Sequence, residues 1–325
     1  MDLKKLQEGI KEGQVRCLAK GITLVESTLE IHQNQAEELL TQLMPFTGGA
    51  LKIGISGIPG VGKSTFIEAF GNFLLDENPN RKLAVLAVDP SSPIHGGAIL
   101  GDKTRMEELS VHPRAFIRPS PGGGAVGGIS RRARESILLM EACGYDTIFV
   151  ETIGVGQSET LVASMVDVFL MLQMPNMGDE LQGMKKGILE LADIIAINKA
   201  DGELKEAAQR SKIEHEQALR FTSMDSCPTP VILLSSKNKE GLDQIWQELG
   251  IFVERQKDNG SFEQKRQNQV AQWFERELGE QIQAIAANHQ DYNGLFKEFE
   301  NKVRQRKLAP SVAARTFIRK ILKVC

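Results

Sequence analysis

Short apolar runs alternate with helix-like stretches through the middle of the chain. Several runs are almost entirely Val, Ile, Leu and Ala, the composition of strands that are buried on both faces of a sheet. The candidate strands cover residues 51–56, 82–88, 114–119, 146–151, 168–173, 194–198 and 230–236. Because strands that alternate with helices are joined by right-handed crossovers, the pattern predicts an α/β fold with a doubly wound, mainly parallel sheet.

The pattern changes on both sides of this core. Residues 1–46 have the spacing of polar amphipathic helices that end near Pro45, and the chain after the polar segment 256–261 is helical again. The sequence therefore predicts three parts. They are an N-terminal helical segment (1–48), an α/β domain (49–255) and a C-terminal helical arm (256–325).

One helix of the arm carries an apolar stripe at helical spacing. The stripe consists of Val270, Phe274, Leu278 and Ile282, flanked by Trp273 and Ile285. Two interpretations are open, since such a stripe can pack on its own domain or form a subunit interface.

Composition narrows the class of protein. Hydrophobic residues at 41% and charged residues at 25% are typical of a soluble globular chain. The net charge of −3 gives no electrostatic reason to expect nucleic-acid binding, and no apolar window has the length of a membrane span. The four cysteines form no C-x-x-C pair and the N-terminus lacks a secretory signal, so we expect a reduced, cytoplasmic protein.

The strongest local motif is GIPGVGKST, which fits the P-loop pattern G-x-x-x-x-G-K-[ST] between a strand and a helix. Backbone N–H groups of such a loop surround phosphate oxygens, and the following helix start favours the same anion. Lys63 is expected to reach the β- and γ-phosphates, and Ser64 to bind Mg²⁺. The predicted phosphate-binding residues are Gly57, Ile58, Pro59, Gly60, Val61, Gly62, Lys63, Ser64 and Thr65.

Two further segments predict which base is bound. In NKAD (Asn198, Lys199, Asp201), the Asp carboxylate can accept hydrogen bonds from guanine N1–H and N2–H₂, which adenine lacks. The Lys stem can cover the base. The segment SSKNKEGL supplies Ser235, Ser236 and Lys237 as further base contacts, and the three motifs together predict GTP binding.

Acidic residues after two strands are candidates for holding the magnesium ion. Asp89 and Glu151 each follow a strand at the edge of the sheet that carries Ser64, where Mg²⁺ needs oxygen ligands. Glu151 is long enough to act through a bound water. Gln157 is a candidate for positioning the attacking water, although its spacing differs from that of small GTPases.

Three longer segments resemble one family. VDPSSPIHGGAILGDKTRM (88–106), ETIGVGQSE (151–159) and GDELQGMKKG (178–187) are similar to the MeaB/ArgK family, which is also the methylmalonic aciduria type A family. These proteins are G-protein chaperones of adenosylcobalamin-dependent methylmalonyl-CoA mutase. The resemblance implies a homodimer with a P-loop GTPase core, an N-terminal helical segment and a C-terminal dimerisation arm.

The resemblance also implies roles for single residues. It assigns Asp89, Asp102 and Glu151 to the Mg²⁺ and switch region, so that 90–106 becomes a first switch ordered by the γ-phosphate. It makes the loop with Asp179 and Lys185 an additional switch that responds to the mutase. The expected catalytic residues are Lys63, Glu151, Asp179 and Lys185. The glycine-rich segment 119–128 fits a lid and a plain connector equally well.

The function expected from these features is a GTPase that gates adenosylcobalamin loading and protection of methylmalonyl-CoA mutase or a related B12-dependent mutase. A cobalamin adenosyltransferase is a further candidate partner, and we expect no direct binding of cobalamin. Two alternatives stay open. A nickel-insertion GTPase should carry a His-rich tract or paired Cys ligands, and a transport-related kinase usually uses ATP, which NKAD disfavours.

Overall fold

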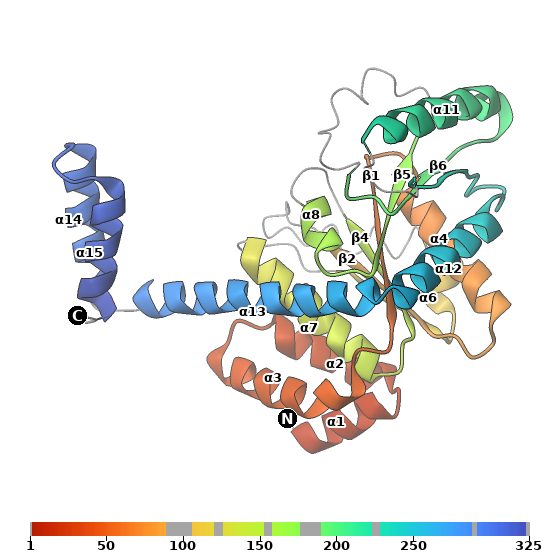
Figure 1. Cartoon of the computed structure of the whole chain (residues 1–325). Coiled ribbons are helices and arrows are strands. Elements are labelled where there is room, and N and C mark those ends of the chain that lie inside the picture. The colour runs from red at the N-terminus through yellow and green to blue at the C-terminus, as the bar shows by residue number, and fades with distance from the viewer. Residues whose placement is uncertain are drawn as a thin grey trace. The chain divides into compact units, whose positions relative to one another are not determined.

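The computed structural model describes residues 2–88, 106–119, 126–152, 158–175, 190–222, 228–287 and 291–322. By its internal contacts the chain divides into two compact units, Met1–Arg266 and Gln267–Cys325 (Figure 1). The first unit contains the N-terminal helices together with the sheet. The predicted three-part division into functional domains stays a prediction.

A seven-stranded sheet with the order β3-β2-β4-β1-β5-β6-β7 forms the centre of the first unit. Its strands are β1 (Leu51–Gly57), β2 (Leu83–Val88), β3 (Ala115–Pro119), β4 (Thr147–Thr152), β5 (Val168–Gln173), β6 (Ile194–Ile197) and β7 (Val231–Leu233). All pairings between these strands are parallel, which confirms the predicted α/β class and sheet type. β1 lies in the middle of the sheet, so the loop that follows it opens into the crevice where such sheets bind ligands.

Helices cover both faces of the sheet. The helices α4 (Lys63–Glu77), α6 (Glu107–Val111) and α12 (Leu242–Asp258) lie on one face, and α7 (Val126–Ala142), α8 (Ser158–Ala163) and α11 (Lys205–Thr222) on the other. Because side chains alternate along a strand, each strand contributes to two separate cores. On the α4 face, the rings of Phe66 and Phe149 both stack on Phe70, with centroids 5.2 and 5.6 Å away.

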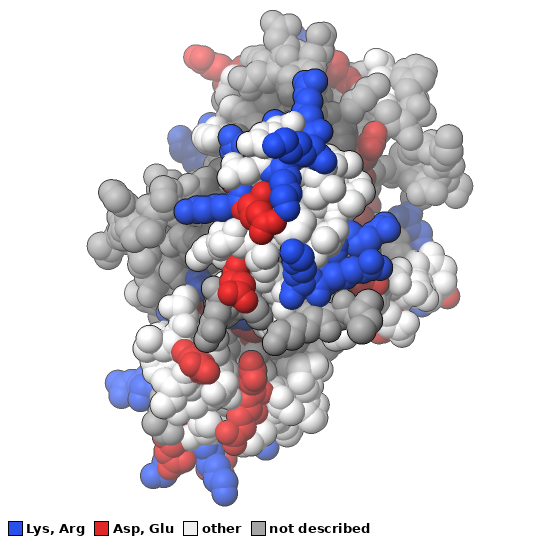
Figure 2. Space-filling model, turned by 90° about the vertical axis from the view of Figure 1, so that its left-hand side faces the viewer, with Lys and Arg blue, Asp and Glu red and all other residues white. Residues whose placement is uncertain are grey.

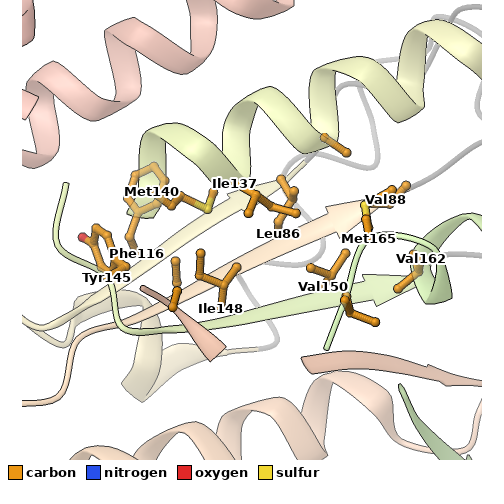
Figure 3. Close-up of a cluster of buried hydrophobic side chains, with 14 of the residues drawn as sticks. Leu86, Val88, Phe116, Ile137, Met140, Tyr145, Ile148, Val150, Val162 and Met165 are labelled. Carbon is orange, nitrogen blue, oxygen red and sulfur yellow. The ribbon is translucent and has the colours of Figure 1, made fainter. Parts of the chain in front are cut away.

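The N-terminal helices α1 (Leu3–Lys11), α2 (Val15–Glu26) and α3 (Glu30–Leu43) form a further layer, followed by the short 3-10 helix η1 (Met44–Phe46). All three helices contact α7, which therefore lies between them and the sheet. Figure 3 shows Ile137 and Met140 of α7 above Leu86 and Ile148 of the sheet. The predicted amphipathic helices ending near Pro45 are confirmed.

The first turns of α13 (Ser261–Ala287) are fixed to the sheet by an ion pair whose carboxylate is buried. Arg266 donates from Nε and Nη2 to the carboxylate of Asp167, at 2.8 and 2.7 Å. It also donates to the carbonyl oxygens of Gly48 and Ala50, at 2.6 and 2.7 Å. Burial lowers the pKa of Arg266, but the hydrogen bond and charge of Asp167 outweigh it, so the pKa is raised overall. The guanidinium is thus a fixed cation joining three segments.

Arg266→Ala is expected to lower the free energy of unfolding by about 3 kcal/mol, because it leaves a buried carboxylate without its bidentate partner. Lys52, with Nζ 3.7 Å from the Asp167 carboxylate, keeps the loss near the low end of the range for such pairs. Chemical unfolding of the full chain measures it. The control is Arg304→Ala, which removes an exposed pair with Glu300 and should cost under about 1 kcal/mol. Equal losses in the two variants would contradict the prediction.

The second unit continues α13 and adds α14 (Tyr292–Arg304) and α15 (Pro310–Leu322). Phe317 packs edge-on against Tyr292, Phe296 and Phe299, with ring centroids 5.3 to 6.1 Å apart. Residues 291–322 hold eight Lys and Arg against three Asp and Glu, although the whole chain has a net charge of −3. Basic side chains are also prominent on the face that Figure 2 presents. The whole-chain charge therefore conceals a local basic excess.

Candidate functional site

The P-loop connects β1 to α4 at the carboxyl edge of the sheet. Lys63 is the first residue of α4, and Gly62 before it has a left-handed backbone with φ of +96°. A Cβ atom on Gly62 would lie only 2.8 Å from Nδ2 of Asn198. Both the backbone angle and the close approach require glycine here, so the motif's second glycine has a structural reason.

The Lys63 side chain folds back over the loop. Its Nζ donates to the carbonyl oxygen of Gly57 at 2.7 Å and lies 3.4 Å from that of Ile58. Burial lowers the pKa of Lys63, while the negative charges of Glu151 and Glu159 act in the opposite direction. The ammonium group is therefore held inside the loop, in the position from which it can exchange carbonyl oxygens for phosphate oxygens.

Asn198 joins the P-loop to both base-recognition segments. Its Nδ2 donates to the carbonyl oxygen of Val61 at 2.8 Å. Its Oδ1 accepts from the backbone N–H of Ser236 at 3.1 Å and from the Ser236 hydroxyl at 2.9 Å. Asn198 is 1% exposed, and these three hydrogen bonds connect the P-loop to the Ser235–Ser236 segment; its predicted contact with the base stays a prediction.

Lys199, Asp201 and Ser235 are the neighbouring residues of the two base-recognition segments. Lys199 has a positive φ of 60°, and its Nζ donates to the carbonyl oxygen of Gly60 at 2.6 Å, so its stem extends along the P-loop. The Ser235 hydroxyl hydrogen-bonds the carboxylate of Asp201, and Ser235 also accepts from the N–H of Asn238 at 3.1 Å. One carboxylate oxygen of Asp201 thus accepts from Ser235, and an ionised carboxylate has further lone pairs that can accept from a pair of donors.

Glu151 and Ser64 are the described candidates for the magnesium site. Glu151 shares a strand face with Phe149, on the side of the sheet that packs against α4, the helix that begins with Lys63 and Ser64. Glu151 is 3% exposed. No group of three or more His, Cys, Asp and Glu that could hold a metal occurs in the part of the chain that is described. Two oxygen donors still fit Mg²⁺, which takes most of its ligands from phosphates and water in such sites.

Several predicted residues lie outside the described residues. They are Asp89, Asp102, Gln157, Asp179 and Lys185, with the loops 90–105 and 178–187 and residues 120–125 of the glycine-rich segment. Among the remaining predicted contacts, Pro59, Thr65 and Lys237 are exposed, whereas Val61, Ser235 and Ser236 are buried. The described site thus contains the P-loop and both base-recognition segments.

Three residues that the sequence analysis did not select lie at the same edge. Gln173 ends β5, and its carbonyl oxygen accepts from the N–H of Asn198 at 2.8 Å. The hydroxyls of Ser56 and Thr152, at the ends of β1 and β4, are hydrogen-bonded at 2.9 Å. A polar residue at the end of an otherwise apolar strand was the signal that could have identified each of them.

Asn198 connects the P-loop to an NKxD segment and a Ser-Ser-Lys segment. This combination defines a P-loop GTPase. Comparison with known proteins identifies which kind. The chain belongs to the family described as methylmalonyl Co-A mutase-associated GTPase MeaB, whose model matches residues 18–291. This confirms the family resemblance of the sequence.

Individual relatives agree with this membership. GTPase ArgK of Escherichia coli is 43% identical over 308 residues, covering 94% of this chain and 92% of the relative. The mitochondrial methylmalonic aciduria type A homolog of Mus musculus is 41% identical over 325 residues, covering 95% of this chain and 77% of the relative. A crystal structure of an LAO/AO transport system kinase has a TM-score of 0.78 at 36% identity, covering 98% and 97% of the two chains.

Proposed function

We propose that this chain is a GTP-hydrolysing chaperone that gates adenosylcobalamin loading and protection of methylmalonyl-CoA mutase or a related B12-dependent acyl-CoA mutase. The observation that carries the proposal is the family match over residues 18–291, which includes the whole described guanine-nucleotide site. In this proposal the chain acts in the cytoplasm and does not bind cobalamin itself. A cobalamin adenosyltransferase is a candidate further partner.

In this proposal, separate residues bind the phosphates, the base and the magnesium ion. Lys63 transfers its hydrogen bonds from the Gly57 and Ile58 carbonyls to the β- and γ-phosphates, and Asp201 pairs with guanine. Ser64 and Glu151, with Asp89 and Asp102, would hold Mg²⁺, and Glu151 acts through water. The metal would neutralise charge that develops on the transferring phosphate.

A homodimer built through the arm is part of the proposal. The apolar stripe on α13 supports it, because its side chains are 43 to 68% exposed in the single chain. Exposed apolar side chains at helical spacing are typical of a surface that is covered by a partner. The residues concerned are Val270, Phe274, Leu278, Ile282 and Ile285.

A transport-related kinase activity is the second candidate. It is favoured by the 36% identity to the crystal structure described as an LAO/AO transport system kinase. The two functions differ in the fate of the γ-phosphate, which a GTPase releases to water and a kinase transfers to an acceptor. The nickel-insertion alternative gains no support from the described residues.

The proposed second switch is tested with Lys185→Ala. In the proposal, docking of the mutase shifts the loop with Asp179 and Lys185 into a conformation that completes the catalytic site. We expect the variant to keep its basal GTP turnover and its binding to the mutase but to lose the stimulation by the mutase. Turnover with and without mutase, together with a pull-down, measures both. A variant that is stimulated as strongly as the parent would show that this loop is only a connector.

A further inference from the structure

Two hydroxyl groups are paired inside the sheet beside the P-loop. Ser56 lies one residue before the end of β1, and Thr152 is the last residue of β4. Thr152 Oγ1 is 2.9 Å from Ser56 Oγ, and the two residues are 0% and 1% exposed. An unpaired hydroxyl at this depth would be destabilising, so each group depends on the other.

This contact lies just beyond the last backbone hydrogen bonds between β1 and β4. The last aligned pair of β1 and β4 is Ile55 with Glu151. On their outer sides both strands stay paired further, because β1 pairs with β5 through Gly57 and β4 with β2 through Thr152. Between β1 and β4, the hydroxyl pair is therefore the next link after the ladder.

The link lies between the two catalytic segments of the protein. Ser56 directly precedes the P-loop, which starts at Gly57, and Thr152 directly follows Glu151. Side chains alternate along a strand, so the hydroxyl pair faces the α8 side of the sheet while Glu151 faces the α4 side, where Lys63 begins the helix. Apolar packing does not require a polar pair here, since Gly54 on the same face is surrounded by Val162, Val166 and Phe169.

We propose that the Ser56–Thr152 hydrogen bond is a positioning contact for GTP hydrolysis. It fixes the end of β4 against the end of β1 and so holds the Glu151 carboxylate in register with the P-loop. This rests on the role given to Glu151 under the proposed function. Small displacements of a catalytic group are costly, with about 10²-fold lost for roughly 1 Å. The pair holds Glu151 through its neighbour in the chain and does not touch the nucleotide.

The test uses substitutions that remove or keep the hydroxyl. Thr152→Val keeps the shape and Ser56→Ala removes only an oxygen, and each should lower kcat by about tenfold with KM and the Kd for GDP within about twofold. Thr152→Ser retains the hydroxyl and should have the kcat of the parent within about twofold. The double variant should lose no more than either single variant, because both remove the same contact.

Thr147→Val is the matched control, since it makes the same change at the other end of β4, where Thr147 bonds Asp146 at 2.7 Å. It should leave kcat unchanged. Full kcat in Thr152→Val, additive losses in the double variant, or equal losses in Thr152→Val and Thr152→Ser would each overturn the proposal. If Thr152→Val does not fold, as shown by thermal unfolding, Ser56→Ala against Thr152→Ser decides.

Glu151→Ala separates this inference from the function on which it rests. If Glu151→Ala lowers kcat and Thr152→Val does not, the role of Glu151 stands and the positioning contact is wrong. If Glu151→Ala leaves kcat unchanged, the proposed role of Glu151 fails, and the positioning proposal fails with it.

Discussion

Replacing Lys63 with Ala is expected to lower GTP turnover by roughly 10²–10³-fold, the loss typical of removing one group that stabilises transition-state charge. Lys63 is the cation held within the P-loop by the carbonyls of Gly57 and Ile58. The measurement is phosphate release at saturating GTP, so that weaker binding does not hide the effect on the chemical step.

Lys205→Ala is the control for this experiment. Lys205 is an exposed lysine at the start of α11, and its loss removes the same charge outside the site. We expect its turnover to equal that of the parent. A loss below about tenfold in Lys63→Ala at saturating GTP would contradict the assignment of Lys63 to the transferring phosphate.

The second large effect concerns the base. Asp201→Asn should exchange the preference for GTP for a preference for xanthosine triphosphate, because the O2 atom of xanthine can accept from the new amide. Sites that read a base through buried hydrogen bonds discriminate by about 10⁴-fold, so the relative affinities should change by that order. The amide oxygen of Asn can still accept from Ser235, which holds Asp201, so the loop keeps its internal contact.

Titrations with GTP, xanthosine triphosphate and ATP measure this exchange. Asp243→Asn, which makes the same change at an exposed position in the first turn of α12, should leave all three affinities as they are. If Asp201→Asn binds GTP as tightly as the parent does, Asp201 does not recognise guanine.

Local sequence was sufficient to predict most of the fold. Parallel strands that are buried on both faces consist of long apolar runs, which makes them visible in the sequence. Each of β1 to β6 begins and ends within one residue of its predicted range, and β7 is shorter than predicted. β7 ends at Leu233, because Ser235 turns to pair with Glu240 and forms the base-recognition loop. The P-loop and NKxD residues were also predictable, since their chemistry requires fixed residue types at short spacing.

Contacts between distant residues were not predictable in this way. Asn198 and Val61 are 137 positions apart, and Ser56 and Thr152 are 96 apart, so no local pattern pairs them. The ion pair of Arg266 with Asp167 depends on where the first turns of α13 meet the sheet. Such contacts follow from the three-dimensional fold, which brings strand ends together irrespective of their separation in the chain.

Among the helices that the structure describes, we find no candidate for a membrane span. The net charge of −3 does not reveal the local basic excess of residues 291–322, because the rest of the chain is acidic and cancels it. The net charge of the whole chain therefore does not indicate where along the chain the charges lie.

The central claim is that GTP hydrolysis by this chain is controlled by a B12-dependent mutase. Its most direct test is GTP turnover by the unaltered chain, titrated with methylmalonyl-CoA mutase and, separately, with an unrelated enzyme of similar size. The account predicts that turnover rises with the mutase, saturates at a fixed ratio of the two proteins, releases the γ-phosphate to water and does not respond to the unrelated enzyme. Turnover that stays constant over the whole titration, or that responds equally to both enzymes, would contradict it.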